Sequence, residues 1–261
     1  MIILFFVLGL IIGSFLNVVI LRLPREKSLA GRSGCPQCGR SLSAGDLVPV
    51  LSFVFLGGKC RGCREPISLR YPIIELITGL GFAGGALVFP PVSLVGILHF
   101  ALFLVVFCVG LVTFVIDLEH YLILDVVTGF GVVSVLLLQI ALDIATHHSL
   151  LGGGATRTAL LGAILGVLPF LLLWFISKGK WLGFGDVKYM IFMGLSLGVS
   201  LVWVGMLLGF WIGALLSLPL LLFGKKKMSS KLPFGTFLVV GQLLAFLWGH
   251  DLIAWYWNLL V

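Results

Sequence analysis

The sequence predicts an all-α polytopic membrane protein with about eight transmembrane helices and a zinc-bound cytoplasmic loop domain. Of the 261 residues, 60% are hydrophobic and only 10% are charged, whereas soluble domains carry about 25% charged residues. Several apolar runs reach the roughly 20 residues that cross a hydrocarbon core of about 30 Å. Because lipid offers backbone groups no hydrogen-bond partners, these runs are expected to be helices.

The apolar runs give the order of the expected spans. They lie near 2–21, 72–90, 94–116, 126–144, 157–177, 186–199, 201–223 and 234–257. The first run lacks a basic n-region and a small-residue cleavage pattern, so we expect a retained helix rather than a signal peptide. The chain therefore divides into a first helix (1–21), a soluble loop domain (22–71) and a membrane domain of about seven helices (72–261).

Basic residues predict the orientation of the chain. Every Lys and Arg except Arg157 belongs to one side of an eight-span topology, counting Lys188 at its membrane boundary; the segments on that side lie around 22–71, 117–125, 178–185 and 224–233. The positive-inside rule places that side in the cytoplasm and both termini outside. The net charge of +7 is then explained by topology and anionic lipid. No nucleic-acid partner is expected, since no basic stripe is interleaved with aromatic residues.

The soluble loop contains two cysteine pairs, CPQC (Cys35, Cys38) and CRGC (Cys60, Cys63). A two-residue gap lets one turn present both thiolates to a tetrahedral ion. A loop of this size has too small a core to hold itself together, and a metal is one remedy. We therefore expect a structural zinc site with four sulfur ligands; redox chemistry is the alternative. Cys108 lies within an apolar run and is expected to pack there.

The acidic residues are few enough to be considered one by one, since Asp and Glu number only 10. Ionisable groups at the membrane are functional candidates. Those near the cytoplasmic helix ends are Glu75, Asp117, Glu119, Asp125 and Asp186, whereas Glu26, Asp46 and Glu65 belong to the loop domain and Asp143 and Asp251 to outer helix ends.

Asp117 and Asp186 are the strongest catalytic candidates. Asp117 ends the third expected span and Asp186 opens the sixth, at similar depth. Helix bundles assemble sites from side chains on different helices. Two carboxylates a few ångströms apart share one proton, so that an acid and a base stand side by side, as in aspartic proteases.

Simpler roles remain open for the same residues. Asp186 can cap the N-terminus of its helix. Asp117 can lie at a helix end with its side chain extended towards water, and Lys188 can pair with either acid. Gly183 and Gly185 remove side chains beside Asp186 and would allow a peptide backbone to approach.

Several short motifs follow one another along nearly the whole chain. They are GSFLNVVILRLP (13–24), CPQCG, GGKCRGC, RYPIIELITG (70–79), IDLEHYLILD (116–125), GFGDVK (183–188) and PFGTFL (233–238). In this order they resemble the motifs of the type IV prepilin peptidases, which also process pseudopilins of type II secretion.

The resemblance implies a membrane aspartic endopeptidase in the bacterial inner membrane, with Asp117 and Asp186 as its active-site pair. Such an enzyme removes a short basic leader after a glycine. Many members then N-methylate the new N-terminal residue with S-adenosylmethionine, and the cysteine-bearing loop is associated with these bifunctional members. Leu124 and Thr236 depart from the family pattern, which often has proline at the first position and proline or a small residue at the second.

Other features are left without a catalytic role. GLGFAG (79–84) formally matches a nucleotide fingerprint but lies inside a span, where small residues permit close helix packing. The residues therefore show no cofactor site. Glu75 faces either the substrate or the loop, and His120 either tunes Asp117 or is solvated.

Two rival functions are considered. One is another GxGD protease that cuts different membrane helices. The other is a non-enzymatic transporter or scaffold, which predicts acids spread across the membrane depth rather than gathered at one face.

Overall fold

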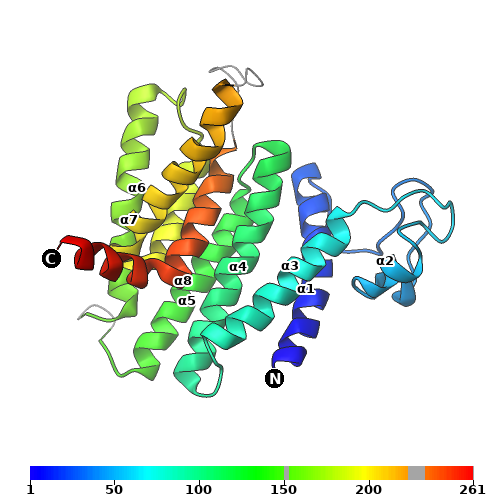
Figure 1. Cartoon of the computed structure of the whole chain (residues 1–261), viewed down its shortest axis with the longest axis horizontal. Helices are drawn as coiled ribbons and strands as arrows, with labels where there is room; N and C mark the ends of the chain where they lie inside the picture. Colours follow the sequence, from blue (N-terminus) through cyan, green and yellow to red (C-terminus); the bar gives the residue numbers. More distant parts are fainter. Residues whose placement is uncertain (150–152, 223–232, 261) are drawn as a thin grey trace. The chain divides into compact units, whose positions relative to one another are not determined.

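The computed structural model describes residues 1–149, 153–222 and 233–260, and these residues are helical apart from their connecting loops. The α-helices are α1 (Ile2–Arg22), α2 (Leu51–Phe55), α3 (Arg70–Val88), α4 (Leu94–His120), α5 (Asp125–Ala145), α6 (Ala155–Ser177), α7 (Phe184–Leu222) and α8 (Phe234–Leu260) (Figure 1). Short 3-10 helices cover Leu23–Arg25 and Ala44–Leu47. Within the described part, β-structure is limited to two isolated bridges, Gly34 with Ser41 and Lys59 with Pro66.

The expected spans agree with these helices to within a few residues, and the chain is a multi-pass membrane protein. Seven helices in the described residues are long and apolar enough to cross a membrane. The sixth of them, Phe184–Leu218, has 35 residues and would extend about 52 Å if straight, well beyond a core of about 30 Å.

Helix α7 is interrupted at Gly198, which has φ 69 and ψ −175. This region of backbone space is open essentially to glycine alone. The chain reverses here, because Met190 and Val202 both lie within reach of a Cβ built on Gly166, whereas 12 residues of straight helix would separate them by about 18 Å. The sixth and seventh expected spans are thus the two halves of α7. The expected cytoplasmic segment 224–233 lies outside the described residues except for Pro233.

The chain forms two compact units, Met1–Phe100 and Ala101–Val261. In the first, α1 and α3 pack closely because glycines remove the side chains between them. A Cβ on Gly13 would lie 2.8 Å from Glu75 Cα, and one on Gly79 would lie 2.9 Å from Leu10 Cδ2. Gly79 begins GLGFAG, so close packing accounts for this glycine.

In the second unit, α7 packs against α6 on one side and α8 on the other (Figure 1). Glycines again set the approach: a Cβ on Gly194 would meet Ala163 of α6, and one on Gly209 would meet Leu238 of α8. This packing fixes where the first turns of α7 and α8 lie relative to each other.

Candidate functional site

Asp117 and Asp186 occupy adjoining helix ends in the second unit. Asp117 lies near the end of α4, which continues to His120 rather than ending at Asp117 as expected. Asp186 lies in the first turn of α7. Both are buried, with 5% and 9% of their surface exposed, and the two carboxyl groups interact electrostatically. The structure therefore brings these two acids together.

Thr236, in the first turn of α8, holds the Asp117 carboxyl group. Its backbone N–H donates to Asp117 Oδ2 at 2.7 Å and its hydroxyl donates to the same oxygen at 3.0 Å. Thr236 is itself buried. A Cβ on the preceding Gly235 would lie 3.0 Å from Asp117 Oδ2, so this glycine lets α8 begin directly beside the acid. In the sequence, Thr236 stands out only as a departure from the family pattern.

Ile123, in the turn between α4 and α5, lies against the first turns of α7 and α8, each of which contains a glycine. A Cβ on Gly185 would be 3.1 Å from Ile123 Cβ, and one on Gly235 would be 2.8 Å from Ile123 Cδ1. The space beside Gly185 is thus taken by the chain itself and not left for a peptide. Gly183 has a different role, since its carbonyl oxygen accepts a hydrogen bond from the Asp186 N–H at 3.2 Å.

Asp125 and Lys188 form an ion pair near this site, with Lys188 Nζ 2.7 Å from Asp125 Oδ2. The partner of Lys188 is therefore Asp125, neither of the two buried acids. The side chains are 37% and 69% exposed, so the pair stabilises the fold by at most about 1 kcal/mol. His120 lies at the exposed end of α4 with Nε2 3.9 Å from Glu119 Oε2.

The four loop cysteines form a cluster in the first unit. The sulfur atoms of Cys35, Cys38, Cys60 and Cys63 all lie within 4.8 Å of one another, and those of Cys35 and Cys63 are 3.9 Å apart. A tetrahedral zinc ion with Zn–S bonds of about 2.3 Å separates its ligands by about 3.8 Å. The cluster fits a closed four-sulfur metal site.

The two cysteine pairs are presented by matching turns. Cys35 N–H donates to Arg40 O and Cys60 N–H donates to Glu65 O, each at 2.9 Å. Hydrogen bonds from the backbone N–H groups of Cys63 and Gly62 lower the pKa of Cys60 to about 6. Burial and the neighbouring cysteine side chains raise the pKa of Cys63 to about 11, so it is at Cys60 that the turn favours the thiolate, which is the form that binds a metal.

Glu75 faces the loop domain. Its Oε2 accepts a hydrogen bond from Val50 N–H at 2.8 Å, and Val50 has a φ of 60, an outlier for a β-branched residue. Glu75 thus connects a strained loop residue to α3. Of the two orientations expected for this acid, towards the substrate or towards the loop, the structure shows the one towards the loop.

Asp143, which the sequence places at an outer helix end, is a structural acid. It is buried, and its carboxylate accepts hydrogen bonds from Ala155 N–H and, at 2.9 Å, from Thr156 N–H. These donors belong to the first turn of α6, whose N–H groups lack partners within their own helix.

Two family models match the chain. The bacterial peptidase A24 N-terminal domain matches residues 7–89, and the type IV leader peptidase family matches residues 102–218. Each of these matches falls within one of the two compact units.

Relatives described as prepilin leader peptidase/N-methyltransferase align with most of the chain. The Aeromonas hydrophila protein is 33% identical over 96% of this chain and 92% of its own length. The Bacillus subtilis protein is 31% identical over 96% of both chains, and the Myxococcus xanthus protein is 39% identical over 77% of this chain and 56% of its own. No solved structure matches. The chain therefore belongs to the type IV leader peptidase family.

Proposed function

We propose that the chain is a membrane aspartic endopeptidase that removes the basic leader of type IV prepilins or pseudopilins after a glycine, and then N-methylates the new N-terminal residue. The observation that carries the proposal is the pair of buried, interacting carboxyl groups, Asp117 and Asp186. Its membership of the family favours this function over another GxGD protease and over a transporter.

Asp117 and Asp186 share one proton in the proposed mechanism. One carboxylate takes a proton from water as the oxygen attacks the scissile carbonyl carbon, and the other carboxyl group donates its proton as the intermediate collapses and the amine leaves. The hydrogen bonds from Thr236 hold the Asp117 carboxyl group in one orientation throughout.

The site suits a substrate with a basic leader and an apolar helix. Lys178, Lys180 and Lys188 mark the same end of the bundle as Asp186, and the positive-inside rule favours the cytoplasmic side of a bacterial inner membrane. The leader then stays in the cytoplasm while the substrate helix lies in the bilayer.

Separate Asp117→Asn and Asp186→Asn substitutions test the peptidase. General acid–base groups contribute roughly 10²–10⁴-fold, so each variant should lose at least about 10²-fold in leader removal from a purified prepilin. Asp251→Asn, on an exposed aspartate of α8, is the matched control and should cleave normally. Wild-type cleavage by either active-site variant would contradict the assigned pair.

Zinc is proposed for the four-cysteine cluster, where it would hold the loop domain together. A double Cys60→Ser, Cys63→Ser variant should lose the metal that the purified wild type contains, measured by elemental analysis. Cys108→Ser is the control, because Cys108 lies on α4 and outside the cluster. Retention of zinc by the double variant would show that the ligands are elsewhere.

S-adenosylmethionine is the proposed methyl donor, and it supplies an electrophilic methyl group on a cationic sulfur. Transfer of label from this compound to a cleaved pilin by the full-length enzyme tests this half of the function. Absence of label with normal cleavage would leave a peptidase only.

A further inference from the structure

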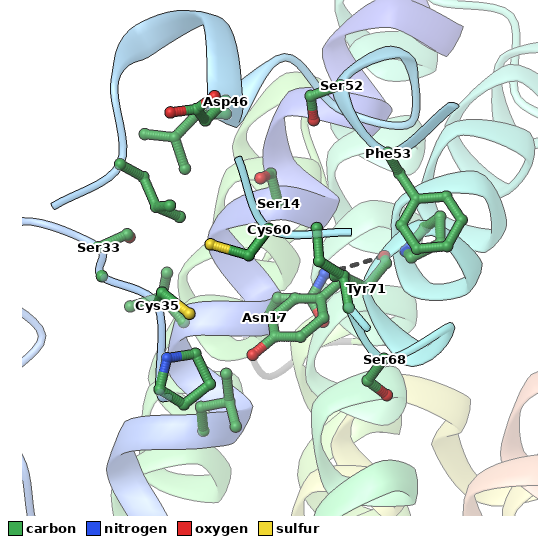
Figure 2. A pocket seen from close by; sticks show the side chains of 18 of the residues that line it. Ser14, Asn17, Ser33, Cys35, Asp46, Ser52, Phe53, Cys60, Ser68 and Tyr71 are labelled. Atoms are coloured by element: carbon green, nitrogen blue, oxygen red, sulfur yellow. Dashed lines mark hydrogen bonds between the residues drawn. The ribbon is translucent and has the colours of Figure 1, made fainter. Parts of the chain in front are cut away.

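The first unit contains a cavity of about 750 Å³ within residues 11–75. It is bounded by α1, by the start of α3 and by the loop that carries the cysteines. Cavities that bind small molecules and cofactors have volumes of about 300–1,000 Å³. Cys35 and Cys60 line it (Figure 2), so the turns of the metal cluster form part of its wall.

Asn17 contributes a polar group that has no partner in the described part of the chain. It lies on α1 with 2% of its surface exposed and lines the cavity. Its Nδ2 donates to Tyr71 O at 3.1 Å, as the dashed line in Figure 2 shows. Its Oδ1 is buried and accepts no hydrogen bond from any described residue. Leaving such an acceptor unsatisfied costs about 1–3 kcal/mol, so a ligand with an N–H or O–H donor fits this place.

The remaining wall combines aromatic surface with charged groups of both signs, since four arginines (Arg22, Arg40, Arg61 and Arg70) line it together with three acids (Asp46, Glu65 and Glu75). Phe53 and Tyr71 supply ring surface in the cavity, and Glu75 supplies a carboxyl group that is 8% exposed. Asp46 also lines the cavity, with Oδ1 2.9 Å from Arg61 Nε. Ring surface suits a nucleoside base, and the carboxyl group of Glu75 suits a cationic group beside it.

We propose that this cavity binds S-adenosylmethionine, with Asn17 Oδ1 accepting a hydrogen bond from the ligand. The inference rests on the proposed methyltransferase function and gives that function a place in the first unit. Adenosine offers amino and hydroxyl donors to Asn17 and a flat base to the aromatic rings. Glu75 balances the positive charge of the ligand. The cavity lies apart from Asp117 and Asp186 in the sequence, in the other compact unit.

Calorimetric titration of S-adenosylmethionine into the full-length protein in lipid nanodiscs tests the placement. One hydrogen bond contributes about 0.5–1.5 kcal/mol, so Asn17→Leu should weaken binding about threefold to tenfold. Ser52→Trp fills the cavity from its loop side and should remove measurable binding. Thr78→Val is the matched control: Thr78 is buried on α3, its hydroxyl donates to Ile74 O and to no other described residue, and it does not line the cavity. The affinity of this variant for S-adenosylmethionine should equal that of the wild type.

The outcomes separate this placement from the proposed function. Wild-type affinity in both Asn17→Leu and Ser52→Trp, together with methyl transfer by the wild type, would overturn the placement and leave the function intact. Absence of both binding and methyl transfer in the wild type would overturn both.

A second measurement uses no variant. Ultraviolet crosslinking of labelled S-adenosylmethionine to the wild type, followed by peptide mapping, should place the label within residues 11–75. Label confined to residues 101–261 would overturn the placement even if the variants failed to fold.

Discussion

Thr236→Val removes one of the two hydrogen bonds that hold Asp117 while keeping the size and branching of the side chain. The hydroxyl lies 3.0 Å from Asp117 Oδ2, and the backbone N–H that remains lies 2.7 Å from the same oxygen. The variant therefore loosens the orientation of the carboxyl group without leaving Oδ2 unbonded.

The expected magnitude follows from the charge on the acceptor. A hydrogen bond to a charged group contributes about 1.5–3 kcal/mol, against about 0.5–1.5 kcal/mol between neutral groups. Since the acid pair carries one negative charge when it shares a proton, the rate of leader removal should fall about tenfold to a little over a hundredfold. We expect the loss in kcat more than in KM, because Thr236 acts through Asp117.

The assay is leader removal from a purified prepilin by full-length protein in nanodiscs, with kcat and KM measured separately. Thr236→Ser keeps the hydroxyl and should retain most of the activity. Thr113→Val is a matched control on α4, since Thr113 is buried and its hydroxyl has no described partner. A Thr236→Val enzyme within twofold of the wild-type kcat would refute the positioning role, and equal losses in Thr236→Val and Thr113→Val would point to general destabilisation.

Two further substitutions test other parts of the structure. Asp143→Asn places an amide N–H₂ against the N–H groups of α6 and should lower the free energy of unfolding by about 1–3 kcal/mol. Thermal unfolding measures this change. An effect no larger than that of Asp251→Asn would show that the hydrogen bonds from Asp143 to α6 contribute little. Lys188→Met breaks an exposed ion pair and should change the free energy of unfolding by less than about 1 kcal/mol and the rate of leader cleavage by less than about fivefold. A loss of more than tenfold in the cleavage rate would give Lys188 a direct part in the reaction.

Much of the architecture could be predicted because membrane insertion depends on local composition. The apolar runs matched the helices to within a few residues, and the two halves of α7 were separated at 199–201, next to the break at Gly198. The CPQC and CRGC spacings likewise predicted the cysteine cluster, because each pair is a turn whose geometry is set within a few residues.

The partners of individual polar groups were harder to predict. Pairing of Lys188 with one of the two buried acids was left open by the sequence, and the structure instead pairs it with Asp125, on the first turn of α5. Asp143 was expected at an outer helix end, but the sequence did not indicate that it is buried and accepts hydrogen bonds from the first turn of α6. Both assignments depend on which faces of two helices meet, and hydropathy along one helix does not contain that information.

Sequence signals existed for two residues that were not singled out. Asn17 is an amide within the apolar run 2–21, and Thr236 follows a glycine at the start of the last helix. Neither signal showed that Asn17 Oδ1 would be left without a described partner beside a cavity, or that Thr236 would bond an acid 119 residues away.

By itself, the sequence determined the approximate ends of the spans and the cysteine cluster, because these depend on hydrophobicity and short spacings. The tertiary structure alone determined the hydrogen bonds from Thr236 to Asp117, the partner of Lys188 and the cavity beside Asn17. These features arise where glycine-lined helices pack closely, and hydrogen bonds between segments distant in the sequence form only once that packing is set.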